Sequence, residues 1–187
     1  MTMKRACVLA ILAAAVLAPR PVAAADQIIF LVRHAERAAP AQAPAPEPTP
    51  QAQRGAARHG MMIADDASLS PAGEQRAAKL AAMLGAAGVK QIFTTEFKRT
   101  RQTATPLAQK LKLTPVMAAA KDVDPLVAAI RKTGGNVLVV GHANTVPDLL
   151  RKLGVTEAVT IGDNDYDNLF VVVRSAAGTA TLVRLKY

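Results

Sequence analysis

The segment QIIFLVRHAER, residues 27–37, sets the expected fold class of this 187-residue chain. Its first six residues form an almost continuous apolar run that ends abruptly at Arg33 and His34. Such a run is typical of a strand buried on both faces of a parallel sheet. A second apolar run, VLVV at residues 137–140, is followed after one glycine by His142. Two of the three histidines therefore stand directly after predicted buried strands.

Strand and helix patterns alternate along the rest of the chain. Further strands are predicted at residues 91–95, 113–117, 169–174 and 181–186, and amphipathic helices at residues 71–84, 99–111, 124–133 and 146–153. Pro106 should lie in or near the first turn of its helix, or kink the helix. This alternation predicts an α/β fold, a three-layer α/β/α sandwich with a largely parallel sheet. In such folds ligands bind beyond the carboxyl ends of the strands.

The N-terminus has the pattern of a secretory signal peptide, residues 1–25. A short basic region precedes an uninterrupted apolar run at residues 6–18, and small residues up to Ala25 offer a cleavage site. The run is too short to span a bilayer, which disfavours the alternative of an uncleaved anchor helix. We therefore expect a periplasmic or secreted domain, residues 26–187, with no stable membrane anchor. Cleavage would also remove Cys7, the only cysteine.

Composition excludes several classes of function. The formal net charge of +9 fits an anionic partner, but aromatic residues make up only 3% of the chain. Because proteins that bind single-stranded nucleic acid use aromatic stacking platforms, we expect no nucleic-acid partner. A single cysteine excludes an internal disulfide and a cysteine-based zinc site. Residues 38–57 are rich in Ala and Pro and are predicted to form a surface insertion, whose role the sequence leaves open.

The side chains that follow the predicted strands are suited to binding an oxyanion. Arg33 and His34 follow one strand, His142 follows another, and the strand at residues 91–95 leads to Arg99 at the start of a helix. Helix N-termini attract anions, and arginine binds phosphate through a planar fork of N–H groups. Two histidines and two arginines at one edge of a sheet predict an oxyanion site that contains a nucleophile.

Four segments of the chain resemble the histidine phosphatase superfamily, the phosphoglycerate-mutase-like family. Arg33-His34-Ala35-Glu36 is similar to its Arg-His-Gly-Glu signature, residues 69–73 to its Leu-Thr-x-x-Gly helix start, residues 94–104 to its Ser-x-x-x-Arg-x-x-Gln-Thr-Ala segment, and residues 139–142 to the strand that presents its second histidine. The resemblance covers nearly all of residues 26–187 and implies a mixed six-stranded sheet with one antiparallel strand. The triplet Arg58-His59-Gly60 follows no predicted strand, and we assign it no role.

The resemblance also implies a role for each residue of the site. His34 would be the nucleophile and become a transient phosphohistidine, with its other ring nitrogen donating to a backbone carbonyl. Arg33, Arg99 and His142 would hold the phosphoryl oxygens. Glu36 would orient arginine or histidine side chains. With this much fixed positive charge, we expect no metal and no other cofactor.

The acid that protonates the leaving group is the least defined part of the site. One branch of the family carries Asp directly after the second histidine, but this chain has Ala143 there. Another branch carries Glu in a loop after the second helix, where this chain offers Asp122 and Asp124, and Glu96 is a third candidate. We favour Asp122, because Asp124 is well placed to cap the helix that opens at Pro125.

The expected function is that of an exported phosphomonoesterase of the histidine acid phosphatase type. Its substrate would be a phosphorylated small molecule, phosphoprotein or envelope glycan, and the sequence names neither that substrate nor the oligomeric state. The alternative is a phosphate-binding pseudoenzyme that keeps the cationic pocket but lacks an efficient proton donor. Asp163, Asp165 and Asp167 alternate like calcium ligands but lack the glycine and glutamate of an EF-hand loop, so we expect a solvated loop there.

Overall fold

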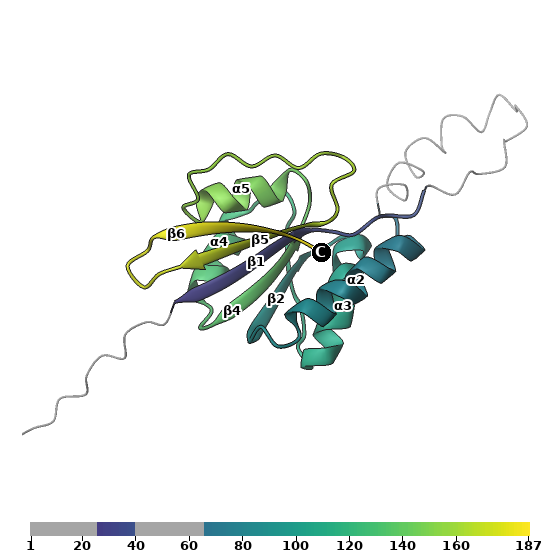
Figure 1. Ribbon diagram of the computed structural model, residues 1–187, viewed down its shortest axis with the longest axis horizontal. Coiled ribbons are helices and arrows are strands. Elements are labelled where there is room, and N and C mark those ends of the chain that lie inside the picture. The colour runs from purple at the N-terminus through teal and green to yellow at the C-terminus, as the bar shows by residue number, and fades with distance from the viewer. Residues whose placement is uncertain (1–25, 40–65) are drawn as a thin grey trace, which may run out of the picture.

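A single mixed sheet runs through the middle of the protein (Figure 1). The computed structural model describes residues 26–39 and 66–187. The strands are β1 (Gln27–Arg33), β2 (Val89–Thr95), β3 (Val116–Ala118), β4 (Asn136–Gly141), β5 (Asn168–Arg174) and β6 (Ala180–Lys186). Their order in the sheet is β3-β2-β4-β1-β5-β6, and β5 runs antiparallel to both of its neighbours. The other pairs are parallel, which confirms the six-stranded mixed sheet with one antiparallel strand.

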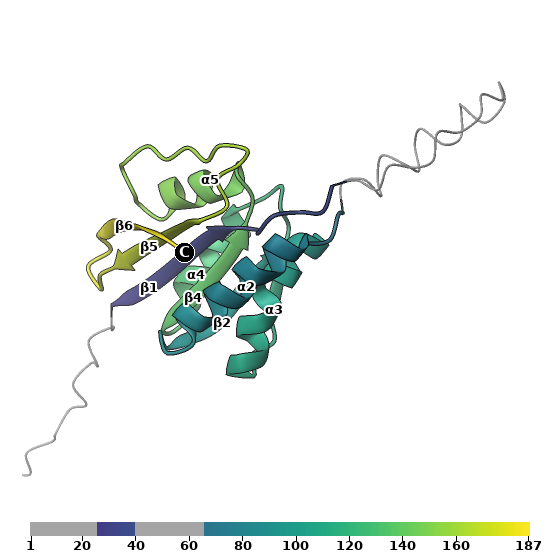
Figure 2. The same cartoon turned by 45° about the vertical axis from the view of Figure 1, so that its right-hand side comes forward.

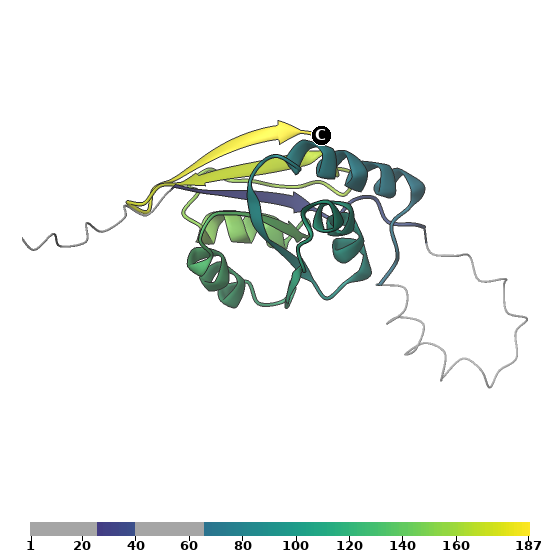
Figure 3. The same cartoon turned by 90° about the horizontal axis from the view of Figure 1, so that it is seen from below.

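Helices cover both faces of this sheet. The helices are α2 (Pro71–Leu84), α3 (Lys98–Leu111), α4 (Asp124–Lys132) and α5 (Thr145–Lys152). α2 and α3 pack beside one another on one face, whereas α4 and α5 cover the other (Figures 2 and 3). β1 is apolar on both faces because both faces are buried. Phe30 and Val32 point into the core under α2 and α3, whereas Ile29 and Leu31 point into the core under α4 and α5. The three-layer α/β/α sandwich is confirmed.

Pro106 lies well inside α3 rather than in its first turn, so that part of the expectation is wrong. Having no N–H, Pro106 cannot donate the helical hydrogen bond to the carbonyl of Gln102. The signal peptide at residues 1–25 and nearly all of the insertion lie outside the described residues, as does the triplet Arg58-His59-Gly60.

The segment that follows β1 is tied to the start of α2. The N–H of Ser70 donates to the carbonyl of Glu36 at 2.9 Å, and the N–H of Ala38 donates to the carbonyl of Ser68 at 2.8 Å. Gly73 makes this approach possible, since a Cβ at its position would lie 2.2 Å from the carbonyl oxygen of Glu36. Ser70 also caps α2 by accepting from the N–H of Gly73. The residues just after β1 and those just before α2 therefore lie side by side.

In the part of the chain that the structure describes, no helix combines the length and the apolar character needed to cross a membrane.

Candidate active site

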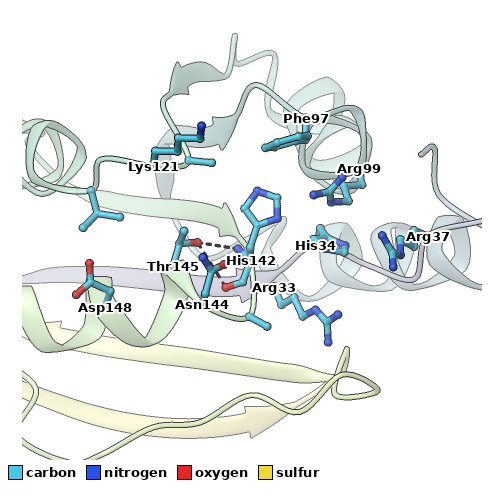
Figure 4. A pocket seen from close by; sticks show the side chains of 13 residues that line it. Arg33, His34, Arg37, Phe97, Arg99, Lys121, His142, Asn144, Thr145 and Asp148 are labelled. Atoms are coloured by element: carbon cyan, nitrogen blue, oxygen red, sulfur yellow. Dashed lines mark hydrogen bonds between the residues drawn. The ribbon is translucent and has the colours of Figure 1, made fainter. Parts of the chain in front are cut away.

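A pocket of about 680 Å³ opens at the carboxyl ends of β1, β2 and β4 (Figure 4). This is the sheet edge at which the sequence predicts the chemistry. The pocket is lined by Arg33, His34, Arg37, Phe97, Arg99, Ala120, Lys121, Val123, His142, Ala143, Asn144, Thr145 and Asp148. The structure thus brings together the two histidines and two arginines that the sequence singled out.

His34 is held at the point where β1 ends. Its backbone N–H donates to the carbonyl of Gly141 at 2.9 Å, which extends the pairing of β1 with β4 by one residue. Its ring Nδ1 lies 2.8 Å from the carbonyl oxygen of Ala35, which can only accept, so Nδ1 carries the hydrogen. The hydrogen bond to a backbone carbonyl expected from the sequence is therefore present, and Nε2 is left with its lone pair.

The surroundings of His34 keep its ring neutral. Burial is the largest cause, and together with the nearby His142, Arg99 and Arg33 it lowers the pKa of His34 from 6.5 to about 3, against the hydrogen bond to Ala35, which acts in the opposite direction. A neutral imidazole with a lone pair on Nε2 is the form that can act as a nucleophile.

His142 stands between His34 and Phe97. Its ring centroid lies 5.3 Å from that of His34 and 5.2 Å from that of Phe97, with both contacts close to edge-to-face. Its backbone N–H donates to Oγ1 of Thr145 at 2.8 Å, in the first turn of α5. Gly141 allows this turn to approach, because a Cβ there would lie 2.8 Å from the same oxygen. β4 and α5 thus fix the backbone that presents the second histidine.

Arg33 is oriented by the loop that precedes β5. Its Nη1 donates to the carbonyls of Gly162 and Asp163, both at 2.8 Å, and its guanidinium lies 4.1 Å from the ring centroid of Tyr166. Its Nε is buried and has no partner among residues 26–39 and 66–187. The sequence predicted only a solvated loop here, and Asp163 and Asp165 are indeed exposed. The loop's contact with Arg33 was not foreseen.

α3 supplies Arg99 and locks its own start against the segment after β1. Arg99 is buried, and its guanidinium lies 4.3 Å from the ring centroid of Phe97. Oγ1 of Thr103 accepts from the N–H of Ala35 at 2.9 Å and donates to the carbonyl of Arg99 at 2.7 Å. Oε1 of Gln102 accepts from the N–H of Leu69 at 2.8 Å. Thr103 therefore ties the residue after His34 to the backbone of Arg99, and Gln102 ties α3 to the segment before α2.

Glu36 lies outside the pocket. The single N–H at Nε of Arg76 is shared between the two oxygens of the Glu36 carboxylate, each at 2.9 Å, and Nη2 donates to Oε1 at 2.6 Å. The hydrogen bonds from Arg76 hold the pKa of the Glu36 carboxyl below its ordinary value. Arg76 also donates to the backbone oxygen of Tyr187 at 2.8 Å. Glu36 therefore orients an arginine of α2, and not one of the arginines or histidines that line the pocket.

The expected division of roles between Asp122 and Asp124 has to be corrected. Asp122 does not line the pocket but a separate cavity between β3 and α4, and its Oδ1 accepts from the backbone N–H of Asp124 at 3.1 Å. Asp124 caps no helix and pairs instead with Lys152. The third candidate, Glu96, accepts from the backbone N–H of Ala120 at 3.0 Å and does not line the pocket either.

Three charged residues of the pocket were not singled out from the sequence. Asp148 is the one carboxylate among the described residues that line it, and it forms an ion pair with Arg151 in the next turn of α5. Arg37 and Lys121 are exposed cations at its rim. Arg37 alone carried a sequence signal, because it lies three residues after His34, whereas the paths of their loop and helix bring Lys121 and Asp148 to the pocket.

Comparison with known protein families agrees with this geometry. Residues 29–121 match the profile of the histidine phosphatase superfamily (branch 1), a range that includes His34 and Arg99. A search of curated protein sequences finds no match to this chain.

Solved structures of phosphatases and of a mutase share the fold. The protein histidine phosphatase SixA, complexed with tungstate, has a TM-score of 0.60 at 17% identity, over 85% of this chain and 96% of SixA. The mycobacterial glucosyl-3-phosphoglycerate phosphatase with inorganic phosphate has a TM-score of 0.58 at 13% identity, over 86% of this chain and 96% of its own. Phosphoglycerate mutase from Plasmodium falciparum has a TM-score of 0.54 at 14% identity, over 86% of this chain and 91% of its own. At these identities the likeness shows the phosphoglycerate-mutase-like fold.

Proposed function

The chain belongs to branch 1 of the histidine phosphatase superfamily, and on that premise we propose that it is an exported phosphatase that acts through a phosphohistidine intermediate on His34. The observation that carries the proposal is the state of His34. Its ring is neutral, Nδ1 donates to Ala35, and Nε2 carries the lone pair in a pocket that also contains Arg33 and Arg99.

The reaction has two in-line displacements at phosphorus. Nε2 of His34 forms a bond to phosphorus while the bond to the leaving group breaks, and the leaving group departs with that electron pair and takes up a proton. Water then attacks the phosphoryl group, the phosphorus–nitrogen bond breaks, and inorganic phosphate leaves with His34 neutral again. Arg33, Arg99 and His142 stabilise the charge on the phosphoryl oxygens in both steps.

The charges around the pocket favour a substrate that carries further negative groups. Arg37 and Lys121 stand at the rim, exposed, whereas Arg33 and Arg99 are buried at the centre. Such a rim attracts a substrate with anionic groups beyond the reacting phosphate more strongly than a small phosphomonoester without them. A phosphoprotein or a phosphorylated envelope glycan fits both this charge and the proposed export.

The leaving group is expected to need little protonation. The one carboxylate at the described part of the pocket, Asp148, is engaged by Arg151. Aryl phosphates, and phosphoramidates such as phosphohistidine, have leaving groups that depart more readily than an alkoxide. The fold neighbour SixA is a protein histidine phosphatase, which supports testing a phosphohistidine peptide as substrate.

A second candidate function is a phosphate-binding pseudoenzyme. It is favoured because the one carboxylate that lines the described part of the pocket, that of Asp148, is already in an ion pair. The experiment that separates the two measures turnover of p-nitrophenyl phosphate, an alkyl phosphate and a phosphohistidine peptide, and traps the phosphoenzyme after rapid mixing. The phosphatase predicts an acid-labile phosphoenzyme that is absent in His34→Asn. Binding of inorganic phosphate without turnover of any of the three substrates would establish the pseudoenzyme instead. Export is tested separately, since mass spectrometry of the secreted protein should find Asp26 at its N-terminus.

A further inference from the structure

Three buried polar groups form a hydrogen-bonded chain that ends on His142. Oγ1 of Thr95, the last residue of β2, lies 2.9 Å from Nε2 of His142 and 2.9 Å from Oγ1 of Thr100 in the first turn of α3. All three side chains are buried, with exposed fractions of 4% for Thr95, 0% for Thr100 and 8% for His142. At this depth water does not compete for the hydrogen bonds, so their directions are set by the protein.

The direction of the chain follows from the hydrogens that each hydroxyl can supply. Oγ1 of Thr100 lies 2.8 Å from the carbonyl oxygen of Phe97 and 3.1 Å from that of Thr95. Carbonyl oxygens only accept, so the single hydrogen of the Thr100 hydroxyl goes to them. The hydroxyl of Thr95 must then donate to Thr100, and it has no second hydrogen for His142. Nε2 of His142 is therefore the donor to Thr95.

We infer that Thr95, backed by Thr100, is a positioning residue for the phosphoryl-transfer site. By accepting from Nε2–H it fixes both the tautomer of His142 and the plane of its ring, which contacts His34 on one side and Phe97 on the other. Because Nε2–H is directed at Thr95, Nδ1 is the ring nitrogen that can face a phosphoryl oxygen, and it donates to that oxygen when the ring is an imidazolium with hydrogen on both nitrogens. The catalytic part of the inference rests on the proposed phosphatase function, whereas the hydrogen-bond direction does not.

Three substitutions separate this role from ordinary packing. Thr95→Val keeps the shape of the side chain but removes the acceptor, and it should lower kcat about tenfold to a hundredfold because a misoriented group in the transition state costs this much. KM should change far less. Thr95→Ser restores the hydroxyl and should recover most of kcat. Thr94→Val is the matched control and should keep wild-type activity, because Thr94 is buried on the same strand and its side chain makes no hydrogen bond to any residue of the ranges 26–39 and 66–187.

Thr100→Val tests the direction of the chain itself. Without the Thr100 oxygen, the Thr95 hydroxyl is released to donate to Nε2, which would place the ring hydrogen of neutral His142 on Nδ1. Nitrogen-15 NMR of the histidine rings in alkaline buffer reads this directly, with the signals assigned by single substitution of each histidine. We expect Nε2–H in the wild type and in Thr95→Ser, and a shift toward Nδ1–H in Thr100→Val.

Each outcome bears on one claim. A wild-type ring with its hydrogen on Nδ1 would overturn the inference, whether or not the protein turns over any substrate. Equal kcat in the wild type and Thr95→Val, with folding verified by circular dichroism, would also overturn it, as would a Thr95→Ser variant no better than Thr95→Val. A wild-type protein inactive on every phosphate tested would refute the proposed function but leave the NMR result to stand by itself.

Discussion

Acidification should destabilise the wild-type protein through His34, and replacing this histidine should remove the effect. In the folded protein the pKa of His34 is lowered from 6.5 to about 3, chiefly by burial. In the unfolded chain the ring titrates near its ordinary pKa. Because the folded pKa is the lower one, the unfolded state binds the extra proton, and the free energy of unfolding falls as the pH drops from 6.5 toward 3.

The magnitude follows from the two pKa values. At a pH between the two pKa values, each pH unit of acidification lowers the free energy of unfolding by about 1.4 kcal/mol. His34 should therefore remove roughly 2 to 3 kcal/mol from the free energy of unfolding between about pH 7.5 and about pH 4.5. At the lower pH the folded protein still holds the ring neutral, so the loss is governed by protonation in the unfolded chain. For a domain of this size the loss is a large fraction of the total stability.

The assay compares urea unfolding of the wild type and His34→Asn at the two pH values. Asparagine keeps an N–H donor for the carbonyl of Ala35 but has no proton to gain. On acidification the free energy of unfolding of the variant should fall by roughly 2 to 3 kcal/mol less than that of the wild type, whatever the stability of the variant at the higher pH. Thr94→Val, which changes no titratable group, should follow the wild type. Identical acid losses in the wild type and His34→Asn would refute the reasoning, because they would mean that burial leaves the pKa of His34 unchanged.

Three further predictions concern the site and its support. Phosphatase turnover should survive dialysis against a strong chelator, because the arginines and His142 already stabilise the transition-state charge; activity that is lost and then restored by zinc would contradict this. Asp122→Asn should leave the hydrolysis rates of both aryl and alkyl phosphates unchanged, and Asp148→Asn should do no more than slow hydrolysis of the alkyl ester. A large loss of kcat in Asp122→Asn, measured by steady-state kinetics, would return Asp122 to the mechanism. Glu36→Gln should lower the free energy of unfolding by about 1 kcal/mol or more, since it leaves Arg76 without its charged partner, and unchanged urea midpoints at neutral pH would argue that the pair contributes nothing.

The sequence by itself determined the fold class and the centre of the site. Continuous apolar runs such as residues 27–32 mean strands buried on both faces, and parallel strands place their carboxyl ends at one edge. His34 and His142 were therefore expected at the same edge, and the pairing of β1 with β4 brings their rings to 5.3 Å. The helix that begins after β2 brought Arg99 to the same edge by the same rule. These positions depend on the local periodicity of the sequence and on the alternation of strands and helices, and both can be read from the order of the residues.

Only the tertiary structure decided which further side chains reach the pocket. Asp122 of a loop lines a separate cavity and Asp148 of α5 lines the site, because the direction of each side chain depends on how its segment packs against segments far away along the chain. The contact of Tyr166 with Arg33 spans 133 positions, and that of Thr95 with His142 spans 47. Hydrogen bonds of this kind join segments that are distant in sequence, and no local sequence pattern predicts them. They form only when the sheet and its helices have packed together.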